Sequence, residues 1–165
     1  LPKTCQPFND HYQGIRMRIV QADVDHLDEV TPLFIKYRET YGQLPKPEAS
    51  RRFLEARLVH EQAIILIAED DDSGKALGFC QFIPSFSALT LSASWVLKGI
   101  YVIEEARRQL VADKLINHAK NLAREAGIER MTVMTGEDNM AAQSLYRSLG
   151  FSNDHDFMYF ALKLK

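Results

Sequence analysis

Arg107 and Arg108 stand in a short charged turn between an apolar stretch, residues 100–103, and a segment with helically spaced apolar residues that begins at Val111. The stretch is rich in β-branched residues, so it predicts a strand that leads into a helix. The turn contains no Ser, Thr, Asp or Asn to cap the first N–H groups of that helix. These amides, the helix dipole and the two guanidinium groups together favour an anion-binding site. A solvated helix start beside the two preceding glutamates is the alternative.

The stretch resembles motif A of the GNAT superfamily of acyl-CoA-dependent N-acetyltransferases, in which a strand ending in Tyr-Val leads into R-x-x-G-x-G/A at a helix start. Arg107, Val111 and Ala112 stand at the positions of the arginine, an aliphatic residue and a small residue. Leu110 replaces the first glycine, where the family's backbone approaches the pyrophosphate of coenzyme A. A left-handed backbone at Leu110 would cost on the order of 1–2 kcal/mol, whereas a helical backbone would leave only the side chain as an obstacle.

The resemblance implies that acetyl-CoA is the co-substrate and that its pantetheine arm pairs with the backbone around Tyr101 and Val102 like an added strand. The thioester would then lie near residues 98–100. The residues expected to bind acetyl-CoA are Ile100, Tyr101, Val102, Arg107, Arg108, Gln109, Leu110, Val111, Ala112, Asp113, Asn139 and Tyr146.

A second segment, residues 139–151, resembles the family's N-x-x-A-x-x-L-Y-x-x-x-G-F pattern at every specified position. The resemblance implies that Tyr146 lies against the cofactor sulfur and is catalytic. A tyrosine hydroxyl is protonated at neutral pH and can protonate the coenzyme A thiolate that leaves after an amine attacks the thioester. Asn139 would contact the cofactor arm at the mouth of the cleft. A packing role on an amphipathic helix is the alternative for Tyr146.

Two further stretches resemble a subgroup that includes histone-type and small-amine acetyltransferases. Residues 37–43 resemble Y-R-x-F-Y-x-Q, and residues 95–102 resemble W-x-L-N-D-L-Y-V, with Lys98-Gly99 in place of Asn-Asp. The match extends over residues 17–164. The general base stays unassigned, with the two glutamates of the charged turn as candidates through water. The candidate walls of an acceptor pocket, for which core packing is an equal alternative, are Tyr37, Tyr41 and Phe86.

Patterns along the chain predict one α/β (α+β) domain with a GNAT-like, mixed but mostly antiparallel sheet of six or seven strands and four helices. Residues 1–16 are interpreted as an N-terminal extension or an expression remnant, and residues 17–165 as the acetyltransferase domain. We expect Pro84 to end a strand, Gly99 to mark a bulge, and the acetyl-CoA cleft to lie between strands 93–103 and 131–135. The remaining expected strands are 17–20, 63–68, 76–83 and 157–164, with a further short one near 152–155, and the helices follow Asp23 and occupy 48–60, 111–126 and 139–149.

The amino-acid composition excludes several classes of protein function. The chain has 165 residues, 46% of them hydrophobic and 25% charged, which is typical of one globular domain. A net charge of -2 gives no electrostatic footprint for nucleic acid, and no apolar run is long enough to span a membrane. The two cysteines predict no disulfide framework and fit a reduced cytoplasm. The five histidines lack the spacing of a metal site, so no metal is expected.

These observations predict an N-acetyltransferase that transfers acetyl from acetyl-CoA to a primary amine of a small molecule or peptide. The alternative is a degenerate GNAT-fold protein that binds acyl-CoA or regulates without turnover, which Leu110 and Gly99 favour. A third hypothesis is an interaction protein that keeps the fold only for its surface. The resemblance also allows a homodimer through the last strands.

Overall fold

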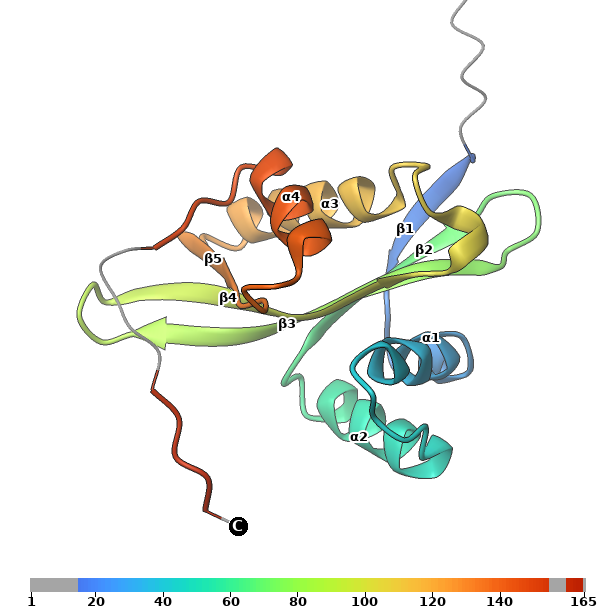
Figure 1. Cartoon of the computed structure of the whole chain (residues 1–165), viewed down its shortest axis with the longest axis horizontal. Coiled ribbons are helices and arrows are strands. Elements are labelled where there is room, and N and C mark those ends of the chain that lie inside the picture. Colours follow the sequence, from blue (N-terminus) through green and yellow to red (C-terminus); the bar gives the residue numbers. More distant parts are fainter. Residues whose placement is uncertain (1–14, 155–159, 165) are drawn as a thin grey trace, which may run out of the picture.

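The structure, a computed structural model, describes residues 15–154 and 160–164 (Figure 1). Within this range one sheet has the strand order β1-β2-β3-β4-β5. The strands are β1 (Met17–Gln21), β2 (Ile64–Asp70), β3 (Ala76–Ser87), β4 (Ser92–Val102) and β5 (Arg130–Val133). The helices are α1 (Leu27–Thr40), α2 (Pro47–Val59), α3 (Val111–Glu125) and α4 (Met140–Ser148), with short 3-10 turns η1 (Val24–His26) and η2 (Glu104–Ala106).

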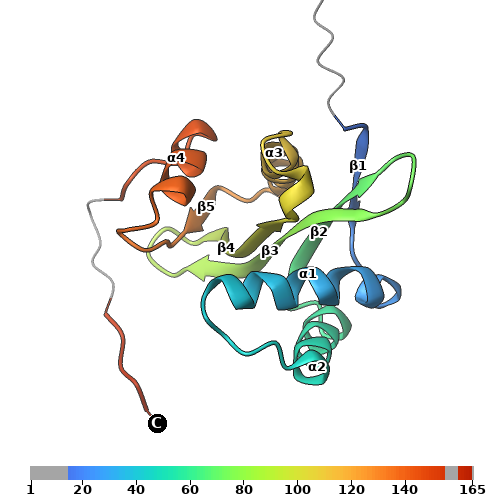
Figure 2. The same cartoon turned by 45° about the vertical axis from the view of Figure 1, so that its right-hand side comes forward.

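The sheet separates two helical layers, with α1 and α2 on one face and α3 and α4 on the other (Figures 1 and 2). Because side chains alternate along a strand, β2 contributes to both layers. Ile65 and Ile67 pack with the α1 face, whereas Leu66 and Ala68 pack with the α3 face. The strand is therefore buried on both sides and forms the centre of the core. None of the helices in the described residues is long and apolar enough to cross a membrane.

The mixed, mostly antiparallel sheet is confirmed, since β1 to β4 pair antiparallel and β5 pairs parallel to β4. The prediction of six or seven strands is wrong, because the described chain forms five. Residues 152–154 and 160–164 are in no strand, and the rest of the expected last strands, like residues 1–14 of the expected extension, lies outside the described residues. Phe160, Leu162 and Leu164 alternate as a strand would, yet they are 82%, 83% and 88% exposed. Alternation without a partner does not make a strand.

Pro84 does not end β3, which continues to Ser87. The pairing of β3 with β2 stops at Phe82, so from there on β4 is the only described strand beside β3. A proline is tolerated where a strand has a free side, because its missing N–H leaves no ladder bond unmade there. The predicted strand end at Pro84 is therefore wrong, because this proline marks a part of β3 without a neighbour on one side and not the end of the strand.

The predicted irregularity at Gly99 is confirmed as a β-bulge in β4. Gln81 pairs with Gly99 and the next β3 residue, Phe82, pairs with Leu97, so Lys98 is the extra residue. The parallel pairing of β4 with β5 also ends at Leu97, opposite Val133. Beyond the bulge, residues 98–102 consequently have β3 on one side, and no strand of the part of the chain that the structure describes lies on the other. We call these residues the open edge of β4.

Candidate active site

Main-chain groups of the open edge alternate in direction. In an antiparallel pair, every second residue turns its N–H and C=O toward the partner strand. Ile103 N donates to Leu77 O across 2.9 Å, which sets the alternation and turns Tyr101 toward β3 as well. Ile100 and Val102 then turn their main-chain groups away from β3, where an extended ligand with amide groups can pair with them.

The open edge leads into the β4–α3 loop, residues 103–110, whose backbone is left-handed at two residues. Arg108 has φ 60° and Leu110, the N-cap residue of α3, has φ 61°. Of the two possibilities at Leu110, the strained left-handed backbone is therefore the one that occurs. Leu110 is 59% exposed, whereas Val111 is 2% exposed and anchors the helix in the core.

The start of α3 has the properties of an anion site. No side chain caps the helix, so its first-turn amides, which include those of Val111, Ala112 and Asp113, have no side-chain partner. A 15-residue helix adds the positive end of its dipole at the same place. The exposed Leu110 side chain does not close the loop over these amides. The residues present thus fit a diphosphate group.

Arg107 lies at the junction of loop and strand. Its Nε donates to Val102 O across 3.2 Å, its Cζ lies 5.8 Å from the centre of the Tyr101 ring, and its Nη1 is 3.9 Å from Glu104 Oε1. The guanidinium therefore ties the loop to the end of β4 and occupies one carbonyl of the open edge. Gln109 makes a similar local bond, from Nε2 to Glu105 O across 2.9 Å.

Tyr146 is fixed on α4 by helix ends that the sequence predicts. Asn139 is the N-cap, and its Oδ1 accepts from Ala142 N across 3.1 Å. At the other end Phe151 N donates to Tyr146 O and Gly150 N to Arg147 O, across 2.9 and 3.0 Å, which is a Schellman ending. The Phe151 ring lies edge-on to the Tyr146 ring, 5.8 Å between centres. The glycine–phenylalanine pair thus orients the tyrosine.

Tyr146 belongs to a tyrosine cluster with Tyr37 of α1 and with Tyr41, the C-cap residue of that helix. Burial, and then the neighbouring Tyr41, raise the pKa of Tyr146 to about 12. Burial, then Tyr41 and Tyr146, also raise the pKa of Tyr37 to about 12. The rings of Tyr37 and Tyr41 lie edge-on, 5.2 Å between centres, and Tyr37 Oη donates to Lys98 O in the β4 bulge across 2.8 Å. The cluster brings the end of α1, the bulge and α4 together.

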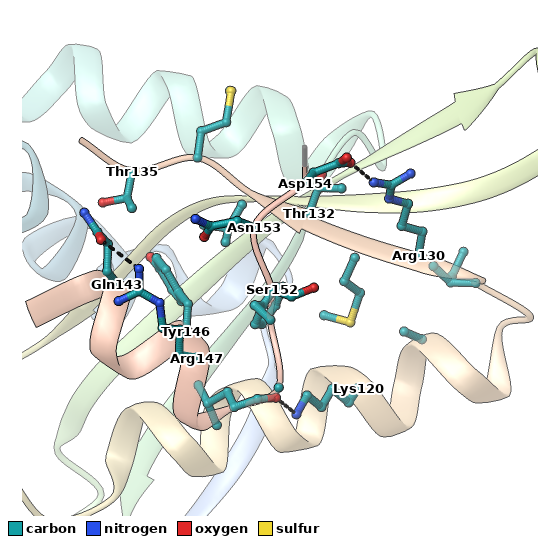
Figure 3. A pocket seen from close by; sticks show the side chains of 18 of the residues that line it. Lys120, Arg130, Thr132, Thr135, Gln143, Tyr146, Arg147, Ser152, Asn153 and Asp154 are labelled. Atoms are coloured by element: carbon teal, nitrogen blue, oxygen red, sulfur yellow. Dashed lines mark hydrogen bonds and ion pairs between the residues drawn. The ribbon is translucent and has the colours of Figure 1, made fainter. Parts of the chain in front are cut away.

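A cavity that Tyr146 also lines runs along β5. Its volume is about 1260 Å³, and its walls come from the C-terminal half of α3, β5, α4 and residues 149–154. Figure 3 shows Tyr146 and Arg147 on one wall and Thr132 on another, with Arg130 ion-paired to Asp154 at the far end. No residue of β4 or of the β4–α3 loop lines it. The cavity follows the edge strand of the described sheet and is separate from the open edge of β4.

The structure places the remaining candidate residues as follows, and their roles stay predictions. Tyr37 was a candidate pocket wall, but its hydroxyl bonds the β4 main chain, a contact between residues 61 positions apart that no local pattern signals. Tyr41 is 59% exposed beside it, whereas Phe86 is 82% exposed on the distal part of β3. The candidate bases Glu104 and Glu105 form η2 in the β4–α3 loop.

Comparison with known proteins identifies the family. The model of the Acetyltransferase (GNAT) family matches residues 27–151. The Bacillus subtilis protein "Uncharacterized N-acetyltransferase YhfO" is 33% identical over 148 residues, which are 90% of this chain and 98% of that protein. A crystal structure of a probable acetyltransferase is 53% identical, with a TM-score of 0.86 over 90% of this chain and 98% of that one.

A more distant structure has the same fold. The aminoglycoside N-acetyltransferase AAC(6')-Iy, solved in complex with CoA, has a TM-score of 0.77 at 22% identity, covering 92% of this chain and 98% of its own. With the family model matching most of the chain, this protein belongs to the GNAT family and is an acetyltransferase whose acetyl donor is acetyl-CoA.

Proposed function

We propose that this acetyltransferase transfers the acetyl group of acetyl-CoA to a primary amine of a small molecule or peptide. The observation that carries the proposal is the continuity of three features along one path: uncapped amides at the start of α3, the open edge of β4, and the tyrosine cluster at the bulge. A strand rises about 3.3 Å per residue, so the bulge and the loop lie roughly 13 Å apart along the open edge. The path suits a long, amide-containing donor with a diphosphate at one end.

In this proposal the diphosphate lies against the β4–α3 loop, at residues 107–113, and the amide-containing arm pairs with Ile100 and Val102. Asn139 borders the same path. Arg107 both holds Val102 O and supplies positive charge beside the diphosphate. The donor supplies a thioester, and the chain's own residues orient it and exclude water from it.

Tyr146 is proposed as the acid that protonates the departing thiolate, while the attacking amine nitrogen loses its proton to water and the tyrosine regains one from water. Its raised pKa, caused mainly by burial, keeps the proton on the hydroxyl at neutral pH. General acid catalysis contributes typically 10²- to 10⁴-fold. We therefore expect Tyr146→Phe to lower kcat by about 100-fold or more while the Kd for acetyl-CoA changes less than about threefold.

The test combines calorimetric titration with acetyl-CoA and a screen of primary amines for thiol release. Ser148→Ala is the matched control, because it removes another hydroxyl from α4, one that bonds Leu145 O across 2.7 Å on the exposed surface. Its kcat should equal that of the wild type. Unchanged turnover in Tyr146→Phe would refute the acid role. Saturable binding without turnover of any amine would favour the degenerate acyl-CoA-binding alternative, and no binding at millimolar donor would favour an interaction protein.

A cytoplasmic location and a homodimer are further parts of the proposal, drawn from cysteine usage and from the family resemblance. Fractionation of the producing cells tests the first. Sedimentation at several protein concentrations tests the second, and a concentration-independent monomer would contradict it.

A further inference from the structure

The bulge of β4 is held from the α1 face of the sheet by one side chain. Tyr37 Oη donates to Lys98 O across 2.8 Å, and Lys98 is the residue that the bulge inserts between the pairs Gln81–Gly99 and Phe82–Leu97. An extra residue in a strand is left outside the ladder, so its carbonyl is free to accept from a side chain. Tyr37 supplies the donor.

Gly99 allows the tyrosine ring to lie directly on the strand. A Cβ atom at residue 99 would be 3.2 Å from two carbon atoms of the Tyr37 ring, closer than ordinary van der Waals contact. The absence of a side chain at Gly99 is therefore matched to the ring that covers it.

The direction of the Tyr37 hydroxyl is fixed by its surroundings. The ring lies edge-on to Phe79 and to Tyr41, with 6.0 and 5.2 Å between centres, and 6.2 Å from the centre of Phe34. Its raised pKa keeps the hydroxyl protonated, so it remains a donor throughout the physiological range. The donor is thus pre-positioned by the core of α1 and not by the flexible end of a long side chain.

We propose that Tyr37 is a positioning residue for acetyl transfer, which fixes the β4 bulge through Lys98 O and so aims the main chain of residues 98–100 at the reacting thioester. The inference rests on the proposed function. Without the bond, the extra residue can move along β4, and a shift by one residue turns the following side chains to the other face. The main-chain groups of Ile100 and Val102 would then leave the open edge.

The direct test is Tyr37→Phe, which keeps the ring and removes only the hydroxyl. Thr40→Val is the matched control, because Thr40 Oγ1 also donates to a main-chain carbonyl, Tyr37 O, across 2.6 Å, but does not touch β4. With folding checked by circular dichroism, we expect kcat of Tyr37→Phe to fall about threefold to tenfold, the range that one net hydrogen bond gives. The Kd for acetyl-CoA should rise by no more than the same factor, because the pairing of Ile100 and Val102 with the donor arm is weakened while the β4–α3 loop is unchanged. Thr40→Val should match the wild type in both.

Hydrogen exchange separates positioning from direct chemistry. The amides of Gly99 and Tyr101 face β3, and in Tyr37→Phe they should exchange at least about fivefold faster, while those of Thr40→Val should not. Faster exchange with unchanged kcat would reduce Tyr37 to a structural role and overturn the proposal. Lower kcat with unchanged exchange would make Tyr37 a direct participant and overturn it as well.

Gly99→Ala provides an independent check through the same bond. Its methyl group should displace the ring and lower kcat, and the loss should not add to that of Tyr37→Phe, since both changes act on one hydrogen bond. Additive losses would contradict the coupling. A wild-type protein that turns over no amine would overturn the proposed function and the positioning role with it, whereas an active wild type with an equally active Tyr37→Phe overturns only the positioning role.

Discussion

The left-handed backbone at Leu110 predicts an inverted order of stability between two substitutions. A left-handed conformation costs a residue with a Cβ atom about 1–2 kcal/mol, and Leu110→Gly removes that strain whereas Leu110→Ala keeps it. Both variants lose the burial of the remaining two-fifths of the side chain, about 0.6–1.2 kcal/mol from the usual 1.5–3 kcal/mol for a fully buried leucine. Glycine also costs about 0.4–1 kcal/mol through the unfolded chain.

The difference between the variants is the informative quantity, because the burial loss cancels. Leu110→Gly should be more stable than Leu110→Ala by about 0.5–1 kcal/mol, roughly 0.3–0.5 M in the urea midpoint. At an ordinary helical position glycine is the less stable residue by a similar amount, so Asn117→Gly and Asn117→Ala in α3 should show the opposite order. Fluorescence of Trp95, the one tryptophan and 7% exposed, reports unfolding. An alanine variant at residue 110 as stable as the glycine variant would refute the left-handed backbone.

The same pair tests whether Leu110 obstructs the donor. Both variants remove the side chain beyond Cβ, but only Leu110→Gly also removes Cβ and gives the loop a backbone without strain at that position. Calorimetry should show a lower Kd for acetyl-CoA in both if the side chain is the obstacle. A gain confined to Leu110→Gly would assign the effect to the backbone, and unchanged affinity in both would refute any obstruction.

Two further predictions concern the tyrosine helix. Asn139→Ala should lower the free energy of unfolding by about 1 kcal/mol in urea titration, because Ala142 N loses its cap, whereas Asn139→Asp should retain most of it. The pKa values of Tyr37 and Tyr146, raised to about 12, mean that unfolded tyrosines with a pKa near 10 ionise first as pH rises. The contribution of these tyrosines to the free energy of unfolding is therefore complete below about pH 10 and is lost between about pH 10 and 12. Tyr146→Phe should make the free energy of unfolding fall less steeply over this pH range. If kcat were lost because a tyrosine ionised at a pH below 9, the raised pKa would be contradicted.

Local patterns predicted those parts of the site that depend on neighbouring residues. Asn139 and the Gly150–Phe151 pair define both ends of α4 within a few residues, so the setting of Tyr146 follows from the sequence. The bulge at Gly99 was predicted for a similar reason, since a glycine inside a long strand is typical of one.

Contacts between residues far apart in the sequence, and the positions where strands lose a neighbour, could not be predicted from local patterns. The bond from Tyr37 to Lys98 joins residues 61 positions apart and appears only once α1 packs on the sheet. Pro84 predicts a strand end from its type alone, because no local pattern indicates where the pairing with β2 stops. The predicted number of strands is not reached in the described residues. The alternation at Phe160, Leu162 and Leu164 predicts a strand, but a segment forms a strand only when another strand pairs with it.

Leu110 and Gly99, the two departures from the family pattern, argue only weakly against catalysis when the residues around them are considered. Leu110 takes the left-handed backbone that a glycine would adopt there, with its side chain largely in solvent, so the start of α3 stays accessible to an anion. Gly99 leaves the space that the Tyr37 ring fills, and the hydroxyl of that ring compensates the carbonyl which the bulge exposes. The half-buried Tyr37 ring and the missing side chain at Gly99 thus share one space on β4. Neither departure therefore argues for the degenerate alternative.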